Sequence, residues 1–344
     1  MSTTNSTLGK LAWLAYLATA AIALSACSQS TPVNTVRIPL GAGGVGFLPL
    51  QMMREFRLIE KHAQAAGVAD IQVQWIELGG PAVMNDALLS GSVDFIAAGP
   101  PAFLTLWDRT QGAVDVKGVA AIAALPMYLN TTAAHLNRLE DLRESDRIAV
   151  TAIKVSIPAL VMQMYALDQY GMDAVERFDP FTVTMTHPDG VVAMLSGSTE
   201  VNSHFTSPPF HQRETAQPGI RTIMSTDDVL GGPTTFTMLS TTSAFHDGNP
   251  AVYGAVLAAL SEAQAMIGED PDSAAGVLVR AGQGGGFTAA EITEVLRDPD
   301  IDFSRVPKNT MRYAKFMHQV GSIRNEPADW RDLFFPEIHD AAGN

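Results

Sequence analysis

Cysteine and basic residues are both scarce in this chain. Cys27 is the single cysteine among 344 residues, and 22 Lys and Arg stand against 36 Asp and Glu, for a net charge of -14. One thiol forms no intrachain disulfide, and it leaves no thiolate metal cluster and no cysteine nucleophile after residue 27. Because the charge is acidic and no Lys/Arg cluster is present, the sequence disfavours nucleic acid as a partner.

Long apolar runs are also missing, with one short exception near the start. Beyond residue 27 no segment approaches the ~18 uninterrupted apolar residues of a membrane-spanning helix. The exception runs from Leu11 to Leu24, interrupted only by Thr19 and preceded by Lys10. At about 14 residues it is too short to cross a bilayer, but it suits the apolar region of a secretory signal peptide.

This apolar run ends in the string Leu24-Ser25-Ala26-Cys27. A small-residue cleavage site that ends on cysteine resembles a bacterial lipobox, in which the cysteine is lipidated and becomes the mature N-terminus. We therefore predict a signal peptide over 1–26, a lipid anchor at Cys27 and a polar tether over 27–35. The protein is then exported, periplasmic or at the cell surface. The alternative is an ordinary secretory signal with an incidental cysteine.

Enzyme signatures are absent from the sequence. Neither Gly-x-Ser-x-Gly nor His-Glu-x-x-His occurs, and the glycine-rich stretch 41–46 lacks the Gly-Lys-Ser/Thr of a phosphate loop. His204 and His211 have no third ligand at useful spacing for a metal. We predict no catalytic residue, no metal and no cofactor.

The chain contains an internal repeat. Residues 87–92 read Ala-Leu-Leu-Ser-Gly-Ser and residues 193–198 read Ala-Met-Leu-Ser-Gly-Ser, so Gly91 and Gly197 are 106 positions apart (197 − 91). A strand-like run precedes each copy, and a short strand and a proline pair follow it. Strand, helix, strand repeated in this way predicts two similar α/β lobes with a cleft between them.

A coarse reading places the remaining elements. About 310 mature residues suit two lobes better than one core. The expected strands lie at 36–40, 71–78, 95–98, 116–124, 127–132, 147–151, 181–186, 201–205 and 236–241. After them the chain is expected to be helical, with a long helix from Pro250, a capping box at Thr288 and Glu291, and a last helix over 308–320.

Several strings carry a family resemblance: Leu89-Ser-Gly-Ser-Val-Asp-Phe95, Arg138-Leu-Glu-Asp-Leu142 and Ala274-Ala275. With the lipobox and the duplicated lobes, they resemble solute-binding proteins of ABC importers in the nitrate/taurine/sulfonate family, which includes thiamine-precursor binders. The likeness covers roughly residues 36–325. It implies an α/β fold of two lobes, with crossings at 127–132 and 236–241, a helical tail on the first lobe, and an ABC permease and ATPase as partners. Lobe one would comprise 36–130 and 240–344, and lobe two 131–239.

The same resemblance implies that the ligand contacts lie in loops after the strands. These loops include 151–156, 187–189 and 204–207 of lobe two. Glycines allow a ligand close to the backbone, and N–H groups at helix N-termini favour an anion. The implied site residues are Gly43, Gly44, Phe47, Gly79, Gly80, Gly99, Pro100, Thr151, Lys154, Ser156, Asp189, His204, Thr206 and Ser207.

Two of these residues have specific expected roles. Ser156 is placed as a helix N-cap before Pro158, and Lys154 is the only nearby cation in lobe two, so a sulfonate- or nitrate-type anion is favoured. His204 faces either the cleft or the core. A neutral or aromatic heterocycle as ligand, a lyase- or dehydratase-like enzyme on the same fold, and a ligand-sensing receptor subunit stay open as alternatives.

Overall fold

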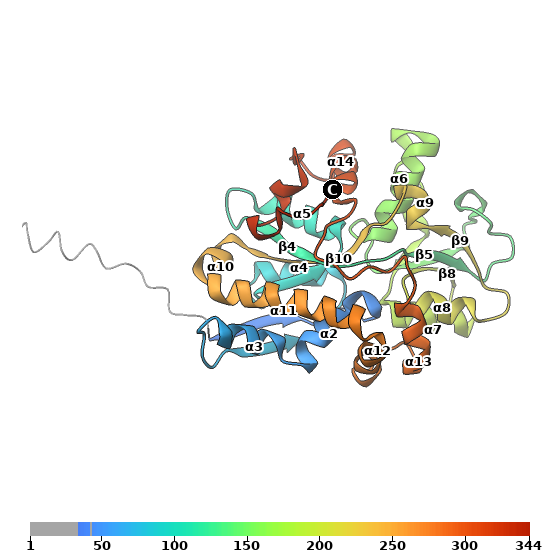
Figure 1. Cartoon of the computed structure of the whole chain (residues 1–344). Helices are drawn as coiled ribbons and strands as arrows, with labels where there is room; N and C mark the ends of the chain where they lie inside the picture. The colour runs from blue at the N-terminus through green and yellow to red at the C-terminus, as the bar shows by residue number, and fades with distance from the viewer. Residues whose placement is uncertain (1–33, 42) are drawn as a thin grey trace, which may run out of the picture. The chain divides into compact units, whose positions relative to one another are not determined.

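The computed structural model describes residues 34–41 and 43–344 (Figure 1). The predicted signal peptide, Cys27 and most of the predicted tether therefore lie outside the described residues. Within the compact unit Val33–Asn344, two groups of strands form the two predicted lobes.

The first lobe contains five strands in two hydrogen-bonded groups. Their bounds are β1 Thr35–Pro39, β2 Gln72–Ile76, β3 Phe95–Ala98, β4 Val116–Ala124 and β10 Thr235–Thr242. β1 pairs in parallel with β2, and β10 lies antiparallel between β3 and β4. The two groups meet where the Asp94 N–H donates to the Arg37 carbonyl over 2.9 Å, so the strands follow the order β2-β1-β3-β10-β4.

The second lobe is built on one five-stranded sheet. Its strands are β5 Tyr128–Thr131, β6 Arg147–Val150, β7 Thr182–Thr184, β8 Val201–Thr206 and β9 Arg221–Ser225. They follow the order β7-β6-β8-β5-β9, with β6 parallel to both neighbours and β5 antiparallel to both of its own. This order repeats that of the first lobe strand for strand, as the duplicated sequence pattern predicts.

The chain changes sheets between β4 and β5 and again between β9 and β10. The predicted crossings at 127–132 and 236–241 are thus strands that begin directly after each change of sheet. Tyr128–Thr131 belongs to the second sheet and Thr235–Thr242 to the first. Lobe boundaries at 130 and 239 remain a prediction, and the sheets favour boundaries a few residues earlier.

Helices cover both sheets. The first lobe carries α2 Leu48–Glu55, α3 Leu58–Ala65, α4 Pro81–Leu89 and α5 Pro100–Thr110, and the second carries α6 Ile157–Tyr170, α7 His187–Ser196, α8 Phe210–Thr215 and α9 Thr226–Leu230. The tail comprises α10 Ser243–Gly248, α11 Pro250–Glu269, α12 Pro271–Arg280, α13 Ala289–Leu296 and α14 Thr310–Gln319. Because α11 packs on α2 and α3, and α14 on α5, the tail lies mainly on the first lobe, as expected (Figure 1).

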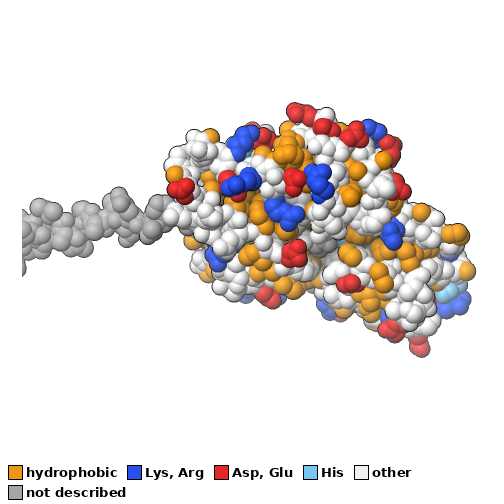
Figure 2. Space-filling view, turned by 90° about the horizontal axis from the view of Figure 1, so that it is seen from below, with side chains coloured by type: hydrophobic (Ala, Val, Ile, Leu, Met, Phe, Trp, Pro, Cys, Tyr) orange, Lys and Arg blue, Asp and Glu red, His pale blue; other side chains and the backbone are white. Residues whose placement is uncertain are grey.

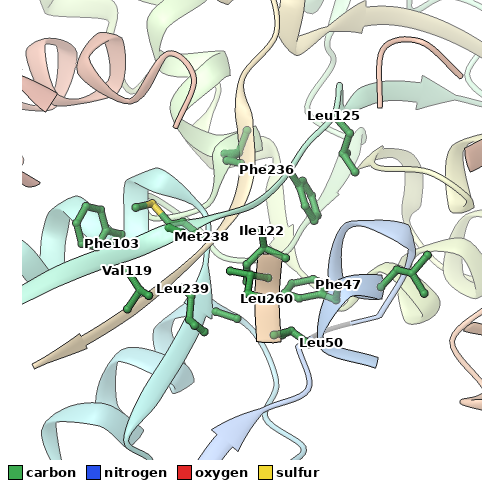
Figure 3. Packing of buried hydrophobic residues seen from close by; sticks show 14 of the residues in the cluster. Phe47, Leu50, Phe103, Val119, Ile122, Leu125, Phe236, Met238, Leu239 and Leu260 are labelled. Atoms are coloured by element: carbon green, nitrogen blue, oxygen red, sulfur yellow. The ribbon is translucent and has the colours of Figure 1, made fainter. Parts of the chain in front are cut away.

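α11 also forms part of the core. Among the described residues it alone is long and apolar enough to cross a membrane, and half of its apolar window is buried within the protein. Figure 3 shows Leu260 of this helix beside Ile122 of β4 and Leu239 of β10. All three side chains are fully buried, so the helix stabilises the first lobe chiefly by removing apolar surface from water.

The sequence repeat recurs as a structural repeat around Gly91 and Gly197. Both glycines follow the C-terminal end of a helix with positive φ, 70° and 61°. The serines on either side of each glycine bond to one another through their Oγ atoms, over 2.9 Å in the first lobe and 2.8 Å in the second. Glycine ends both helices because the left-handed conformation disfavours a Cβ.

Candidate functional site

A cavity lies between the two lobes. Its volume is about 50 Å³ when measured as the space open to the centres of water-sized molecules. First-lobe residues on its wall are Phe47, Gly79, Pro81, Met84, Ala97, Ala98, Gly99, Phe236 and Thr237, and the other residues are Met127, Thr151, Val155, Ser156, Ile157, Pro158 and His187. The wall is mostly apolar, and none of these described residues is Asp, Glu, Lys or Arg.

Four helices begin at this cavity. α4, α5, α6 and α7 each have a proline at the first or second position, where the missing N–H has no intrahelical partner to lose. The remaining first-turn N–H groups carry the positive end of the helix dipole. The first turns of α4, α5 and α6 contain no acidic residue, so nothing in them offsets that partial charge.

α7 differs in its first turn because of Asp189. The Asp189 N–H donates to Thr186 Oγ1 over 3.3 Å, and that hydroxyl donates to Asp189 Oδ2 over 2.7 Å. Asp189 is exposed and stands outside the cavity wall. This predicted site residue therefore belongs to the helix cap.

Ser156 has the predicted N-cap role. Its Oγ accepts from the Ala159 N–H over 3.4 Å and donates to the Ala152 carbonyl over 2.6 Å. Ser156 also lines the cavity, with Thr151 and Val155 of the same β6–α6 connection. These two hydrogen bonds of the Ser156 hydroxyl stabilise the conformation of the β6–α6 connection.

Glycines bring the two lobes into close contact. A Cβ built on Gly80 would lie 2.9 Å from the Thr151 carbonyl oxygen, and one on Gly99 would lie 3.0 Å from Ile157 Cδ1. The Val45 N–H donates to the Pro208 carbonyl over 3.4 Å, next to Gly44. These approaches hold the first lobe against the second around the cavity.

An aromatic pair forms part of the wall. The rings of Phe47 and Phe236 meet edge to face, with centroids 5.8 Å apart and an angle of 73°. Figure 3 shows both rings among the buried hydrophobic side chains of the core. With Met84 and Met127, they give a solute an apolar and polarisable surface.

Lys154 points away from the cavity. Its ammonium binds the Glu176 carboxylate over 2.6 Å and lies 4.0 Å from Asp179, and about half of its side chain is exposed (54%). The hydrogen bond to Glu176 raises the pKa of Lys154 above its ordinary value. The structure thus places the cation expected at the site on the outer surface.

Two buried histidines lie at the cavity wall, one on it and one behind it. His187 begins α7 and lies on the wall, while His204 and Thr206 of β8 lie behind it. His187 Nδ1 is 3.2 Å from both His204 Nε2 and Thr206 Oγ1. Burial, and then the nearby His204, hold the pKa of His187 well below its ordinary value.

The cavity brings together some of the predicted site residues and not others. On its wall are Phe47, Gly79, Gly99, Thr151 and Ser156. Off the wall are Gly43, Gly44, Gly80, Pro100, Lys154, Asp189, His204, Thr206 and Ser207. Of these, Gly80 and Pro100 are chain neighbours of wall residues. Val155 on the wall lies in the predicted loop 151–156, whereas sequence reasoning missed Met84, Met127, Phe236 and Thr237, which look like ordinary core residues in the sequence.

A second groove, of about 430 Å³ by the same measure, contains two arginines. It is lined in part by Arg138, Arg312, Asp168 and Asp228, so its opposite charges balance. Arg312 donates to the Leu230 and Val229 carbonyls, both over 2.8 Å.

The surface shown in Figure 2 mixes acidic and basic side chains and has no large patch of one sign. In the part of the chain that the structure describes, no three His, Cys, Asp or Glu side chains are grouped to hold a metal.

The chain is similar to proteins of known structure and to one sequence family. The NMT1-like family model matches residues 43–279. The alkanesulfonate-binding protein of Xanthomonas axonopodis bound to MOPS is 15% identical, with a TM-score of 0.66 over 89% of this chain and 99% of that one.

Two further solved structures share the fold. The periplasmic aliphatic sulphonate-binding protein of Escherichia coli is 18% identical, with a TM-score of 0.59 over 89% of this chain and 92% of that one. The periplasmic nitrate-binding protein of Synechocystis is 14% identical, with a TM-score of 0.64 over 88% of this chain and 84% of that one. A search of curated proteins finds no match. These likenesses establish a two-lobed fold of the periplasmic binding protein type.

Proposed function

This chain belongs to the NMT1-like family, and we propose that it is an extracytoplasmic solute-binding protein of an ABC importer. It would capture one small solute in the interlobe cavity and deliver it to a permease and its ATPase. Lipidation at Cys27, which lies outside the described residues, would anchor it to a membrane. Two similar lobes meeting at a cavity support this proposal, since ligands bind beyond the carboxyl ends of strands in open α/β sheets.

The solute class that we favour is a small oxyanion of the sulfonate or nitrate type. The observation that carries this choice is the convergence of α4, α5 and α6 on the cavity with no acid in their first turns. Each such N-terminus carries roughly half a positive charge. First-turn N–H groups bind oxyanions without a side-chain cation, so the displacement of Lys154 is compatible with an anionic solute.

A neutral or aromatic heterocycle is the second candidate. The Phe47–Phe236 pair and the two methionines on the wall support it. Ring stacking and thioether contacts recognise such a solute without a charge.

Binding without turnover is part of the proposal. The serine hydroxyl on the cavity wall, Ser156 Oγ, donates its hydrogen to the Ala152 carbonyl over 2.6 Å. A general base would have to receive that proton instead. We therefore expect any bound compound to be recovered unchanged by mass spectrometry.

A thermal-shift screen tests the solute class. Ethanesulfonate, taurine and nitrate are compared with neutral pyrimidines, and a ligand at about 100 times its Kd adds about 2.7 kcal/mol to the stability. Ala98→Leu fills the cavity wall, and the exposed Ala66→Leu serves as the matched control. Stabilisation by an anion in wild type and in Ala66→Leu, but not in Ala98→Leu, supports the proposal. Equal stabilisation of all three would place the solute elsewhere.

A further inference from the structure

A chain of buried polar side chains leads from the cavity into the second lobe. His187 of α7 lies on the cavity wall, His204 of β8 lies behind it, and Glu214 of α8 lies behind His204. Their exposed fractions are 2%, 1% and 0%. At this depth every polar hydrogen of these side chains needs a partner, either within the protein or in the cavity.

Glu214 is the innermost group. Its Oε1 lies 2.5 Å from His204 Nδ1, and its Oε2 accepts from Asn130 Nδ2 over 2.7 Å. A lone buried carboxylate is costly, whereas a carboxylate paired with an imidazolium is neutral as a pair. Whichever atom of the 2.5 Å bond holds the shared proton, a neutral pair leaves a hydrogen on His204 Nε2.

The amide of Asn130 is oriented by its other neighbours. Its Oδ1 accepts from Thr222 Oγ1 over 2.7 Å and from His211 Nδ1 over 3.2 Å. The amide nitrogen is thereby turned toward Glu214, as a donor. The far end of the chain is thereby fixed, with Glu214 as the acceptor of the Asn130 amide hydrogen.

The hydrogen on His204 Nε2 determines which nitrogen of His187 carries hydrogen. His204 Nε2–H donates to His187 Nδ1 over 3.2 Å, and Thr206 Oγ1 is equally close to the same nitrogen. A neutral imidazole that accepts at Nδ1 carries its hydrogen on Nε2. No hydrogen-bond partner for His187 Nε2 exists among residues 34–41 and 43–344, and this atom belongs to a residue of the cavity wall.

Gly190 makes room for this arrangement. It lies one turn after His187 on α7, and a Cβ at this position would be 2.6 Å from His204 Nε2. The ring of His204 therefore fits beside that of His187 only because position 190 has no side chain.

We propose that the Glu214–His204 pair is a positioning device that fixes His187 as the Nε2–H tautomer and so presents a hydrogen-bond donor to the solute. This inference rests on the proposed function and narrows it to a solute with an acceptor oxygen at that end of the cavity. The first-turn N–H groups of α4 to α6 and this imidazole would share the oxyanion, while neither His204 nor Glu214 touches it.

Nitrogen-15 NMR of the histidine rings tests the device without any solute. In the full chain at pH 7, His187 should show a protonated Nε2 and an unprotonated Nδ1, with the assignment made by comparison with His187→Gln. The reverse pattern, a protonated Nδ1, would overturn the inference while leaving the proposed function standing.

Calorimetric titration with ethanesulfonate then tests whether the His187 tautomer affects the affinity for the solute. Glu214→Leu removes the acceptor beside His204 Nδ1, so nothing holds the hydrogen on His204 Nε2 and His187 loses its fixed Nε2–H tautomer. Affinity should fall about tenfold to hundredfold, as for loss of a hydrogen bond to an anion. Glu200→Gln, at an exposed ion pair of the same lobe, should match wild type.

The outcomes separate the two proposals. A Glu214→Leu protein that melts as wild type, no longer shows the fixed Nε2–H tautomer and binds equally well would refute the role of the pair. So would a Glu214→Leu protein in which His187 keeps the Nε2–H tautomer. If wild type shows the Nε2–H tautomer but binds no ethanesulfonate, taurine or nitrate, the favoured solute class fails and the tautomer assignment stands. If Glu214→Leu does not fold, the wild-type ring spectrum decides.

Discussion

Single side chains were the hardest features to place from the sequence. The cap at Ser156 follows from the local pattern of serine before proline, and it is confirmed. Lys154 was expected near the solute because it is close in sequence to that cap, yet its φ of 65° turns the backbone and its ammonium meets Glu176. His204 left two possibilities open; it is buried, and its Nδ1 lies 2.5 Å from Oε1 of Glu214, ten residues away, which places it in the interior. Sequence proximity gives position along the chain but not the direction of a side chain.

Lys154→Ala is expected to change the affinity for ethanesulfonate less than twofold. The ammonium is half exposed, paired with Glu176, and screened by solvent over distances beyond about 8–10 Å. Calorimetric titration of wild type and variant in the same buffer measures the effect. A tenfold loss would instead bring the Lys154 side chain to the solute.

Stability is expected to fall as the pH decreases from 7 to 5. Burial lowers the pKa of His211 to about 4, and burial followed by His204 lowers that of His187. In the unfolded chain both rings titrate near pH 6.5, so below that pH the unfolded state binds protons that the folded state does not. This stability is complete above pH 6.5 and is lost as the pH falls toward 4.

Urea unfolding at pH 7 and pH 5 measures this loss, which we expect to be about 2 kcal/mol for the His211 ring alone and larger for the two rings together. In His211→Gln the free energy of unfolding should differ less between pH 7 and pH 5 than it does in wild type. An equal or greater stability at pH 5 in wild type would contradict the buried neutral state of these rings.

At the scale of elements, the repeated pattern predicted most of the structure. Strand, helix, a glycine of positive φ and strand recur in both lobes, and the box of Thr288 and Glu291 forms as expected. The strands follow alternation and turn signals that are local in sequence. Short elements were missed: α9 and α10 contain only 5 and 6 residues, too few to show helical periodicity.

Substitutions at the two repeated glycines should have the same cost. Gly91→Ala and Gly197→Ala each place a Cβ in the left-handed region at a site with open space around it, so we expect a loss of about 1 kcal/mol from backbone strain alone. Gly254→Ala, exposed within α11 and without positive φ, should instead stabilise by about 0.5–1 kcal/mol. Unfolding curves of the three variants test this. A gain in stability at either repeated glycine would contradict its backbone conformation.

At the scale of the whole molecule, the duplication predicted two lobes but not how they meet. The common order β2-β1-β3-β10-β4 and β7-β6-β8-β5-β9 follows from repeating one unit. The contacts between lobes involve residues far apart in sequence, such as Gly80 with Thr151 and Val45 with Pro208. Nothing local in the sequence marks such pairs, and for the same reason Met127 and Phe236 were not recognised as part of the cavity wall.

Gly80→Ala should hinder the approach of the lobes. Its Cβ would lie 2.9 Å from the Thr151 carbonyl, and relief of this contact requires the lobes to move apart at a cost of about 1 kcal/mol or more. We expect a weaker affinity for ethanesulfonate and a larger radius of gyration by X-ray scattering than in wild type. Gly248→Ala, at an exposed position with open space, is the control. Equal radii and affinities in all three proteins would show that the contact at Gly80 does not limit closure.

The most direct test of the central claim is a crystal structure of the protein with the anion that stabilises it most in the screen. We expect density for one solute between the lobes, with its oxyanion at the first turns of α4, α5 and α6. One of its oxygens should lie within hydrogen-bond distance of His187 Nε2. Density only in the groove of Arg138 and Arg312, or on the outer surface beside Lys154, would contradict it.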